Sequence, residues 1–233
     1  MSPKLLIVAS LVSFSAWAIS AQSTQQTSPS LLGDPSRLTL VNVTATRVQY
    51  RGRDAIRLLG QRPAGAQANA PANNIAIIDY EFRDGTIEAD IAGIPAAGAD
   101  TSARGFVGIA FRVDSSGDRY AAFYLRPTNG RADDQLRRNH TTQYISEPEY
   151  PWHRLRREFP GVYESYVDLE PGAWTPIRIE VRQGAARLFV NGAKQPVLII
   201  NDMKNPPAVG RIALWIDVGT DAHFSGLRVT PAR

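Results

Sequence analysis

Short runs in which apolar and polar residues alternate recur along the chain from about residue 37 to residue 229. Gly, Pro, Asn and Asp separate them, and no long segment keeps the 3.6-residue period of an amphipathic helix. This pattern predicts an all-β fold, an antiparallel sandwich or barrel. Strands are expected near residues 37–42, 45–50, 54–59, 75–80, 85–91, 105–113, 118–126, 174–183, 186–191, 196–200, 211–218 and 222–229.

The segment GFVGIAFRVDSSGDRYAAFYLR, residues 105–126, predicts a hairpin whose register can be derived. A three-residue loop that ends at Gly117 places a residue tolerant of positive φ where such a loop needs it. Side chains alternate across a strand, so one face becomes apolar and is expected in the core. It comprises Val107, Ile109, Phe111, Val113, Ala121, Phe123 and Leu125.

The opposite face of this hairpin pairs Arg112 with Tyr120, Ala110 with Ala122, Gly108 with Tyr124 and Phe106 with Arg126. Small residues in the middle with Tyr and Arg beside them predict a shallow trough. In RIALWIDV, residues 211–218, Trp215 points away from the apolar side of its strand in the same manner. Further along, the Asn191-Gly192 pair favours a tight turn.

The connection from residue 127 to residue 173 is far longer than an ordinary hairpin loop, and it contains QYISEPEYPWHRLRREFPGVYESY at 143–166. Within it, PWHRLRREFP predicts a short helix with Pro151 in the first turn. Trp152, Leu155 and Phe159 would share one face of that helix, and the edge of the trough is one place where this face could be buried.

Two interpretations of this connection are open. In one, it is a lid whose rings fill space and whose glutamates pair with the neighbouring arginines. In the other, its rings flank a pocket with the trough, and Glu164 is the interior carboxylate and the first candidate general acid or base. The candidate ligand-binding residues are then Arg112, Tyr120, Tyr124, Arg126, Arg138, Tyr144, Trp152, Tyr166 and Trp215. Rings and planar guanidiniums suit a sugar or a sugar acid.

Four phrases occur in order along the chain: GFVGIAFR at 105, YAAFYLR at 120, ARLFVNG at 186 and FSGLRV at 224. Together they resemble the concanavalin A-like lectin/glucanase superfamily, in particular its laminin-G-like and 3-keto-disaccharide hydrolase-type branches, over roughly residues 75–230. The resemblance implies a jelly roll of two antiparallel sheets that binds ligands, often carbohydrate, on the concave sheet or at its rim. The E-x-D-x-E strand of its two-carboxylate glucanases is incomplete, because Ala92 follows Glu88 and Asp90.

The N-terminal residues have the layout of a secretory signal peptide, with Lys4 before an uncharged apolar run that is too short to span a bilayer. We therefore expect a signal peptide at 1–21, a disordered lead-in at 22–33 and a single sandwich domain at 34–233. The mature chain is expected to be exported, periplasmic or secreted, without stable membrane insertion. It contains no cysteine, so packing and hydrogen bonds must hold the fold.

The chain has a formal net charge of +4, and its basic residues are spread along the strands and form no basic run. This distribution gives little support to nucleic-acid binding. The three histidines have no metal-ligand spacing, and no nucleotide-binding motif occurs, so neither a metal nor a cofactor is expected. The leading hypothesis is a carbohydrate-binding sandwich protein. The alternatives are a glycoside hydrolase or lyase of the same fold, and a structural or adhesion module that binds protein or a cell-envelope polymer.

Overall fold

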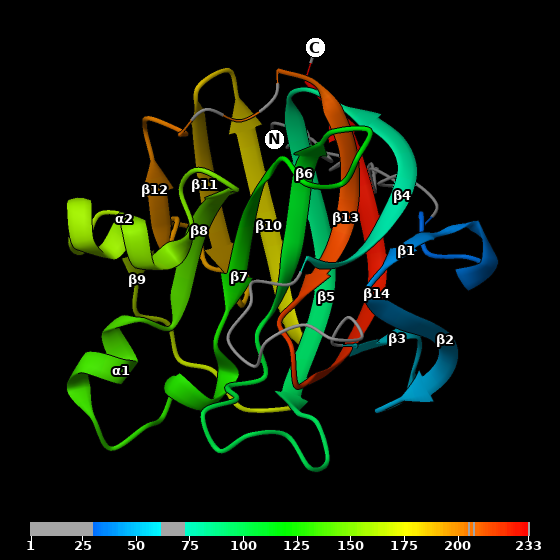
Figure 1. The fold of residues 1–233 in the computed structure, drawn as a ribbon, viewed down its shortest axis with the longest axis horizontal. Coiled ribbons are helices and arrows are strands. Elements are labelled where there is room, and N and C mark those ends of the chain that lie inside the picture. Colours follow the sequence, from blue (N-terminus) through cyan, green and yellow to red (C-terminus); the bar gives the residue numbers. More distant parts are fainter. Residues whose placement is uncertain (1–29, 62–72, 205, 207, 233) are drawn as a thin grey trace, which may run out of the picture.

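The computed structural model describes residues 30–61, 73–204, 206 and 208–232, which build two antiparallel sheets packed face to face (Figure 1). This arrangement confirms the predicted all-β sandwich. The predicted signal peptide and residues 22–29 of the expected lead-in lie outside the described residues. Within the described part of the chain, no helix is both long and apolar enough to cross a bilayer.

The first sheet has seven strands and includes the hairpin that the pattern predicted. In spatial order it comprises β1 (Thr39–Val41), β4 (Asn74–Phe82), β13 (Gly210–Ile216), β6 (Val107–Val113), β7 (Tyr120–Leu125), β8 (Thr142–Glu147) and β9 (Glu164–Ser165).

The second sheet also has seven strands, and it lies behind the first in the view of Figure 1. In spatial order it comprises β12 (Leu198–Ile200), β11 (Ala185–Val190), β10 (Thr175–Arg182), β5 (Gly85–Pro95), β14 (Thr220–Pro231), β3 (Arg53–Gly60) and β2 (Val43–Tyr50). The short helices are η1 (Pro35–Arg37), η2 (Pro127–Asn129), α1 (Gln135–Asn139) and α2 (Trp152–Glu158).

The core lies between the two sheets and is built by the alternation visible in the sequence. In β10, Ile177, Ile179 and Val181 are buried, whereas Arg178 and Glu180 between them are partly exposed. Strands β6 and β7 differ because every one of their residues is buried, on both faces. The outer face of the first sheet, which is the face turned away from the second sheet, is therefore also covered.

The predicted turn at Asn191 and Gly192 is confirmed. Both residues have positive φ, 56° and 69°, and the Ala193 amide donates to the Val190 carbonyl at 3.1 Å. These values are those of a type I′ turn, which matches the twist of paired strands. The turn starts the connection from β11 to β12.

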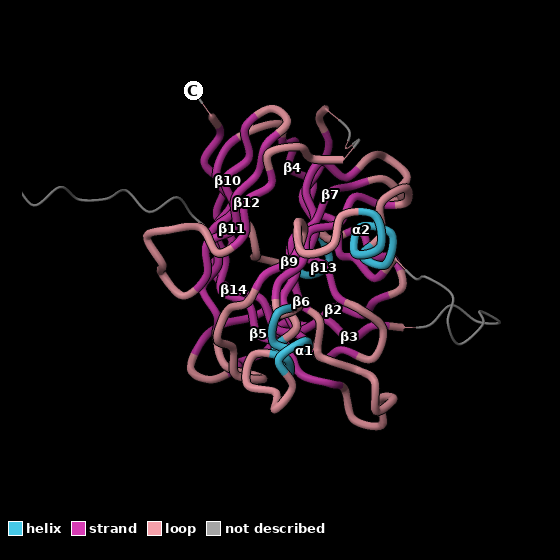
Figure 2. The backbone as a smooth tube through the Cα atoms, turned by 90° about the vertical axis from the view of Figure 1, so that its left-hand side faces the viewer, coloured by secondary structure: helices cyan, strands magenta, loops and turns pink. Residues whose placement is uncertain are grey.

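The long connection adds two strands to the first sheet. Strand β8 pairs with β7, and β9 pairs with β8, so the insertion forms one edge of the sandwich. The predicted helix is confirmed as α2, in which Leu155 is buried and Phe159 packs against the core, but Trp152 is 43% exposed. Figures 1 and 2 both show β9 between α2 on one side and α1 on the other.

Candidate functional site

The predicted register of the hairpin is confirmed in β6 and β7. Gly108 lies opposite Tyr124, Ala110 opposite Ala122, and Ile109 opposite Phe123. The trough residues therefore lie on the outer face of the first sheet. In the neighbouring strands, β13 places Trp215 beside Gly108, and β8 places Gln143 beside Tyr124.

Aromatic side chains fill this trough. The Trp215 Nε1–H donates to the Tyr120 hydroxyl at 3.1 Å, across the β6 strand that separates them, and the Tyr124 ring stacks on Trp215 with centroids 4.5 Å apart. Ala110 and Ala122 consequently have no exposed surface. The prediction of an open trough is therefore wrong. Protein interiors are closely packed, and the aromatic rings occupy the space that the small residues leave free.

Gly108 is required at the centre of this arrangement. A Cβ atom there would lie only 2.6 Å from the Cβ atom of Tyr124, closer than real side chains approach. Because Gly108 has no side chain, the stacked rings have the room that they need. Burial also raises the pKa of both Tyr120 and Tyr124 well above the usual range of a phenol, so both stay protonated.

Arg126 is a buried cation beneath Tyr124. Its guanidinium donates to the His140 carbonyl at 2.7 Å, to the Tyr124 hydroxyl at 2.8 Å and to Gln143 Oε1 at 3.1 Å. It also lies over the rings of Tyr124 and Phe106. Burial lowers its pKa, and the groups that accept its hydrogen bonds are neutral. Arg126 therefore holds Tyr124 and Gln143 in place.

Glu164 lies at the edge of this cluster, next to Gln143 in the register of β8 and β9. It accepts hydrogen bonds from Arg156, at 3.1 Å from Nε and 2.7 Å from Nη2, and its Oε2 lies 2.7 Å from His140 Nδ1. Burial lowers the pKa of His140 although the Glu164 charge opposes that change. The neutral form of His140 is therefore favoured, and its Nδ1 lies against Glu164 without the geometry of a hydrogen bond.

Two exposed rings of the insertion pack against arginine side chains. Arg156 is centred 4.8 Å from the ring of Trp152 on α2, and Arg138 on α1 is centred 5.3 Å from the ring of Tyr166. Arg138 also donates to the Tyr166 hydroxyl at 3.2 Å. Trp152 and Tyr166 are each 43% exposed, so they form an accessible rim on the insertion.

Two of the predicted site residues lie elsewhere. Arg112 has a φ of 54° next to an irregularity in the pairing with β13, and its guanidinium bonds to Asp84, the Arg83 carbonyl and the Gln183 carbonyl. Tyr144 lies opposite Phe123 and is fully buried on the inner face. The prediction that both residues lie beside the trough is wrong. The bulge at Arg112 directs its side chain away from the outer face, and Tyr144 points inward because it alternates with Gln143, which points outward.

The structure brings together the other predicted residues, Tyr120, Tyr124, Arg126, Trp215 and Glu164, with Arg138, Trp152 and Tyr166 on the rim. Sequence reasoning missed His140, Gln143, Glu147 and Arg156 as members of this surface. A signal for two of them was present, because Gln143, Ile145 and Glu147 alternate with Tyr144 and Ser146 as in a strand. No group of three or more His, Asp or Glu in the described ranges could hold a metal ion.

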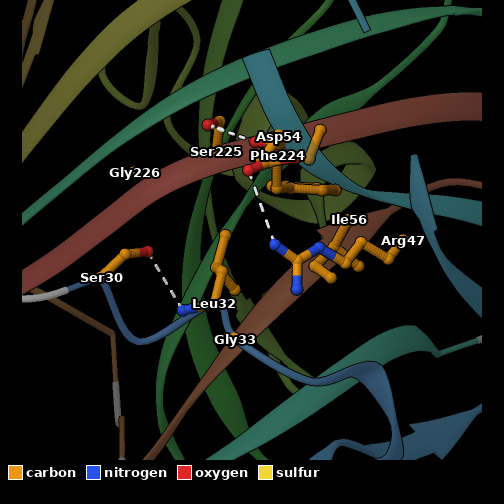
Figure 3. Close-up of a pocket in the computed structure, with 10 residues that line it drawn as sticks. Ser30, Leu32, Gly33, Arg47, Asp54, Ile56, Phe224, Ser225 and Gly226 are labelled. Carbon is orange, nitrogen blue, oxygen red and sulfur yellow. Dashed lines mark hydrogen bonds and ion pairs between the residues drawn. The ribbon is translucent and has the colours of Figure 1, made fainter. Parts of the chain in front are cut away.

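A separate cavity of about 280 Å³ lies between the segment Ser30–Gly33 and strands β2, β3 and β14 (Figure 3). Arg47 and Asp54 form an ion pair of 3.5 Å at its mouth, and the Ser225 hydroxyl donates to the Asp54 carbonyl at 2.7 Å. The cavity contains none of the predicted site residues.

No protein-family model matches the chain, and no curated protein sequence matches it. Among solved structures, the chain is similar to a carbohydrate-binding module (CBM66) from Bacillus subtilis, with 12% identity, a TM-score of 0.53, and coverage of 82% of this chain and 93% of that one. It is also similar to a Bacillus subtilis protein of unknown function with a galectin-like fold, with 13% identity, a TM-score of 0.52, and coverage of 82% and 88%. These likenesses, together with the two packed antiparallel sheets, show that the chain has a jelly-roll sandwich fold.

Proposed function

We propose that the protein binds a saccharide on the rim of the outer face of the first sheet, where Trp152 and Tyr166 pack against sugar rings. One observation carries this proposal. Among the described residues, Trp152 and Tyr166 are the Trp, Tyr or Phe side chains that are exposed, and both lie on the insertion, Trp152 on α2 and Tyr166 directly after β9. Exposed rings beside polar groups are typical of binding surfaces.

The polar groups of the rim suit the hydroxyls of a sugar. Arg156 and Arg138 hold their guanidiniums over the two rings, and donors of this kind can bond to neighbouring hydroxyls while the ring packs against the C–H face. The buried Arg126 donates hydrogen bonds to the His140 carbonyl and the Tyr124 hydroxyl, and so helps to fix the segment that carries the rim. The likeness to a carbohydrate-binding module supports a saccharide as the ligand class.

A second candidate is an enzyme of the same fold that acts on a saccharide. The 2.7 Å approach of His140 Nδ1 to Glu164 favours it, because a neutral histidine beside a carboxylate can take a proton at its other nitrogen. Incubation of the protein with polysaccharides and measurement of new reducing ends tests this candidate. Turnover that Glu164→Gln abolishes supports it, and the absence of any cleavage by the unaltered protein rejects it.

We also infer that the chain is exported, from the charged start and apolar run within residues 1–21. N-terminal sequencing of the protein recovered from an expressing bacterium tests this inference. Cleavage near residue 21 supports export, and an intact N-terminus contradicts it.

The direct test of the binding proposal is a panel of polysaccharides, with laminarin, xylan and starch as neutral members and alginate and polygalacturonate as acidic ones. Trp152→Ala and Tyr166→Ala should each weaken binding about tenfold or more, as expected for aromatic anchors. Ile199→Ala is the matched control, because Ile199 is similarly exposed but belongs to β12 of the second sheet. Unchanged affinity in both rim variants, or no binding to any member of the panel, contradicts the proposal.

A further inference from the structure

Glu147 is a carboxyl group on the same outer face, and it has no partner among the residues that the structure describes. It ends β8 directly opposite Tyr120, and it shares a face with Gln143 because residues two and four apart in a strand point the same way. The residue is partly buried. Among the described residues, no hydrogen bond or ion pair reaches its carboxylate.

The polar groups around Glu147 make hydrogen bonds to other partners. The Tyr120 hydroxyl donates to Asn73 Oδ1 at 3.1 Å and accepts from Trp215, and the Tyr124 hydroxyl accepts from Arg126. The Glu147 charge faces both phenols, since it contributes to the raised pKa of each.

The neighbouring charges are committed as well. Arg119 lies 3.9 Å from Glu149, and Arg154 bonds to Glu158 and to the Glu149 carbonyl. Arg156, on α2, bonds to Glu164. Asp217, after β13, adds a further negative charge near the two phenols. The carboxylate therefore has acceptor capacity that the surrounding groups leave unused.

A partly buried carboxylate without donors is unfavourable in its charged form. Burial accordingly raises the pKa of Glu147 to about 7. A ligand that brings hydrogen-bond donors would satisfy the carboxylate, whereas an anionic ligand would be repelled by it.

We propose that Glu147 is a ligand-binding residue whose carboxylate accepts hydrogen bonds from the hydroxyls of an uncharged saccharide, an inference that rests on the proposed saccharide-binding function. The ligand supplies the donors that the described residues do not. Neutral polysaccharides are then preferred over acidic ones, and Glu147 is the residue that sets this preference.

This role makes binding depend on pH with a definite sign. Hydroxyl donors favour the charged form, so the pKa of Glu147 is lower in the complex than in the free protein, and binding releases a proton. Affinity is then full above about pH 7 and falls as the pH drops below 7, by up to tenfold per pH unit until the pKa of the complex is reached.

The test is isothermal titration of the full chain with laminarin, xylan and starch, and with alginate as the acidic probe, from pH 5.5 to 8.5. We expect tighter binding to a neutral polysaccharide at pH 8 than at pH 6, and proton release when buffers of different ionisation enthalpy are compared. Glu147→Gln should weaken binding at pH 8 about tenfold and remove the pH dependence. Glu149→Gln is the matched control, because it removes a nearby exposed charge, and it should keep the profile of the unaltered protein.

The outcomes separate this inference from the proposed function. If a neutral polysaccharide binds with the same affinity at all pH values and Glu147→Gln binds equally well, the inference is overturned while the binding function stands. Preference for alginate likewise overturns it. If the unaltered protein binds no member of the panel, the proposed function itself fails. Far-UV circular dichroism of each variant shows that it is folded.

Discussion

Glu164 and Glu147 lie on the same outer face of the first sheet, on the adjacent strands β9 and β8, and their surroundings differ. Glu164 has a side chain that is 4% exposed, and it accepts hydrogen bonds from Arg156 and contacts His140. Glu147 is partly buried without a partner among the described residues. Within the described part of the chain, one carboxylate is satisfied by hydrogen bonds and the other is not.

This difference indicates which carboxylate is structural. A buried carboxylate paired with a guanidinium fixes the elements that carry the pair, here β9 and α2, and losing one partner is costly. A carboxylate without donors destabilises its own charged form and gains most when a ligand arrives. The two residues should therefore respond to the same substitution with opposite signs.

The largest expected effect comes from Glu164→Gln. The substitution keeps the shape but removes the charge that Arg156 and His140 face, so the free energy of unfolding should fall by about 3 kcal/mol. Urea denaturation at pH 7 measures it. Glu158→Gln on α2 is the control, because its pairs with Arg154 and Arg157 are more exposed and should be worth less than about 1 kcal/mol. Equal small losses in both variants would contradict the structural role of Glu164.

Glu147→Gln should act in the opposite direction. The folded-state pKa of about 7 lies above the ordinary value of 4.5, so the protonated carboxyl is favoured in the folded protein. That contribution is fully present below pH 4.5 and is lost as the pH rises through 7. The variant should therefore be more stable than the unaltered protein at pH 8, by about 1–2 kcal/mol after screening at a partly exposed site, and equal to it near pH 4. Urea denaturation at both pH values measures it, and a destabilised variant at pH 8 would contradict the comparison.

The smallest effect is expected from Tyr120→Phe. The change removes the hydroxyl that joins Trp215 and Asn73, and it should lower the free energy of unfolding by about 1 kcal/mol. Because that hydroxyl already bonds to Asn73 and Trp215, it does not donate a hydrogen bond to Glu147. The change in the free energy of unfolding between pH 5 and pH 8 should therefore be the same in the variant and in the unaltered protein. A changed pH dependence would mean that Tyr120 donates to Glu147, and the contrast between the two glutamates would weaken.

Local patterns predicted much of the fold. The strands expected from alternation are all present, the hairpin register from Gly108 to Tyr124 is correct, and the helix that begins after Pro151 forms as α2. These features depend on neighbours along the chain, on alternation, turn residues and helix-start residues. Strands β8 and β9 were missed because charges and Pro148 interrupt the apolar pattern that normally marks a strand.

The candidate site was harder to predict because it depends on strand order. Trp215 meets Tyr120 only because β13, distant in sequence, lies next to β6, whose other neighbour is β7. Arg112 lies away from the trough because its φ is positive, and the alternation of residues in the sequence does not indicate such a backbone irregularity. The pairing of Arg156 with Glu164 likewise depends on how the insertion folds back onto the sheet edge. Such contacts between distant segments have no signature in residue spacing.

Amide hydrogen exchange with and without a bound neutral polysaccharide is the decisive test of the proposed binding surface, because it locates the ligand on the molecule. We expect slower exchange in peptides from β8, α2 and β9, residues 142–166, and unchanged exchange in β10 and β11 of the second sheet. Protection confined to Ser30–Gly33 and strands β2 and β3, around the cavity of Figure 3, would contradict it.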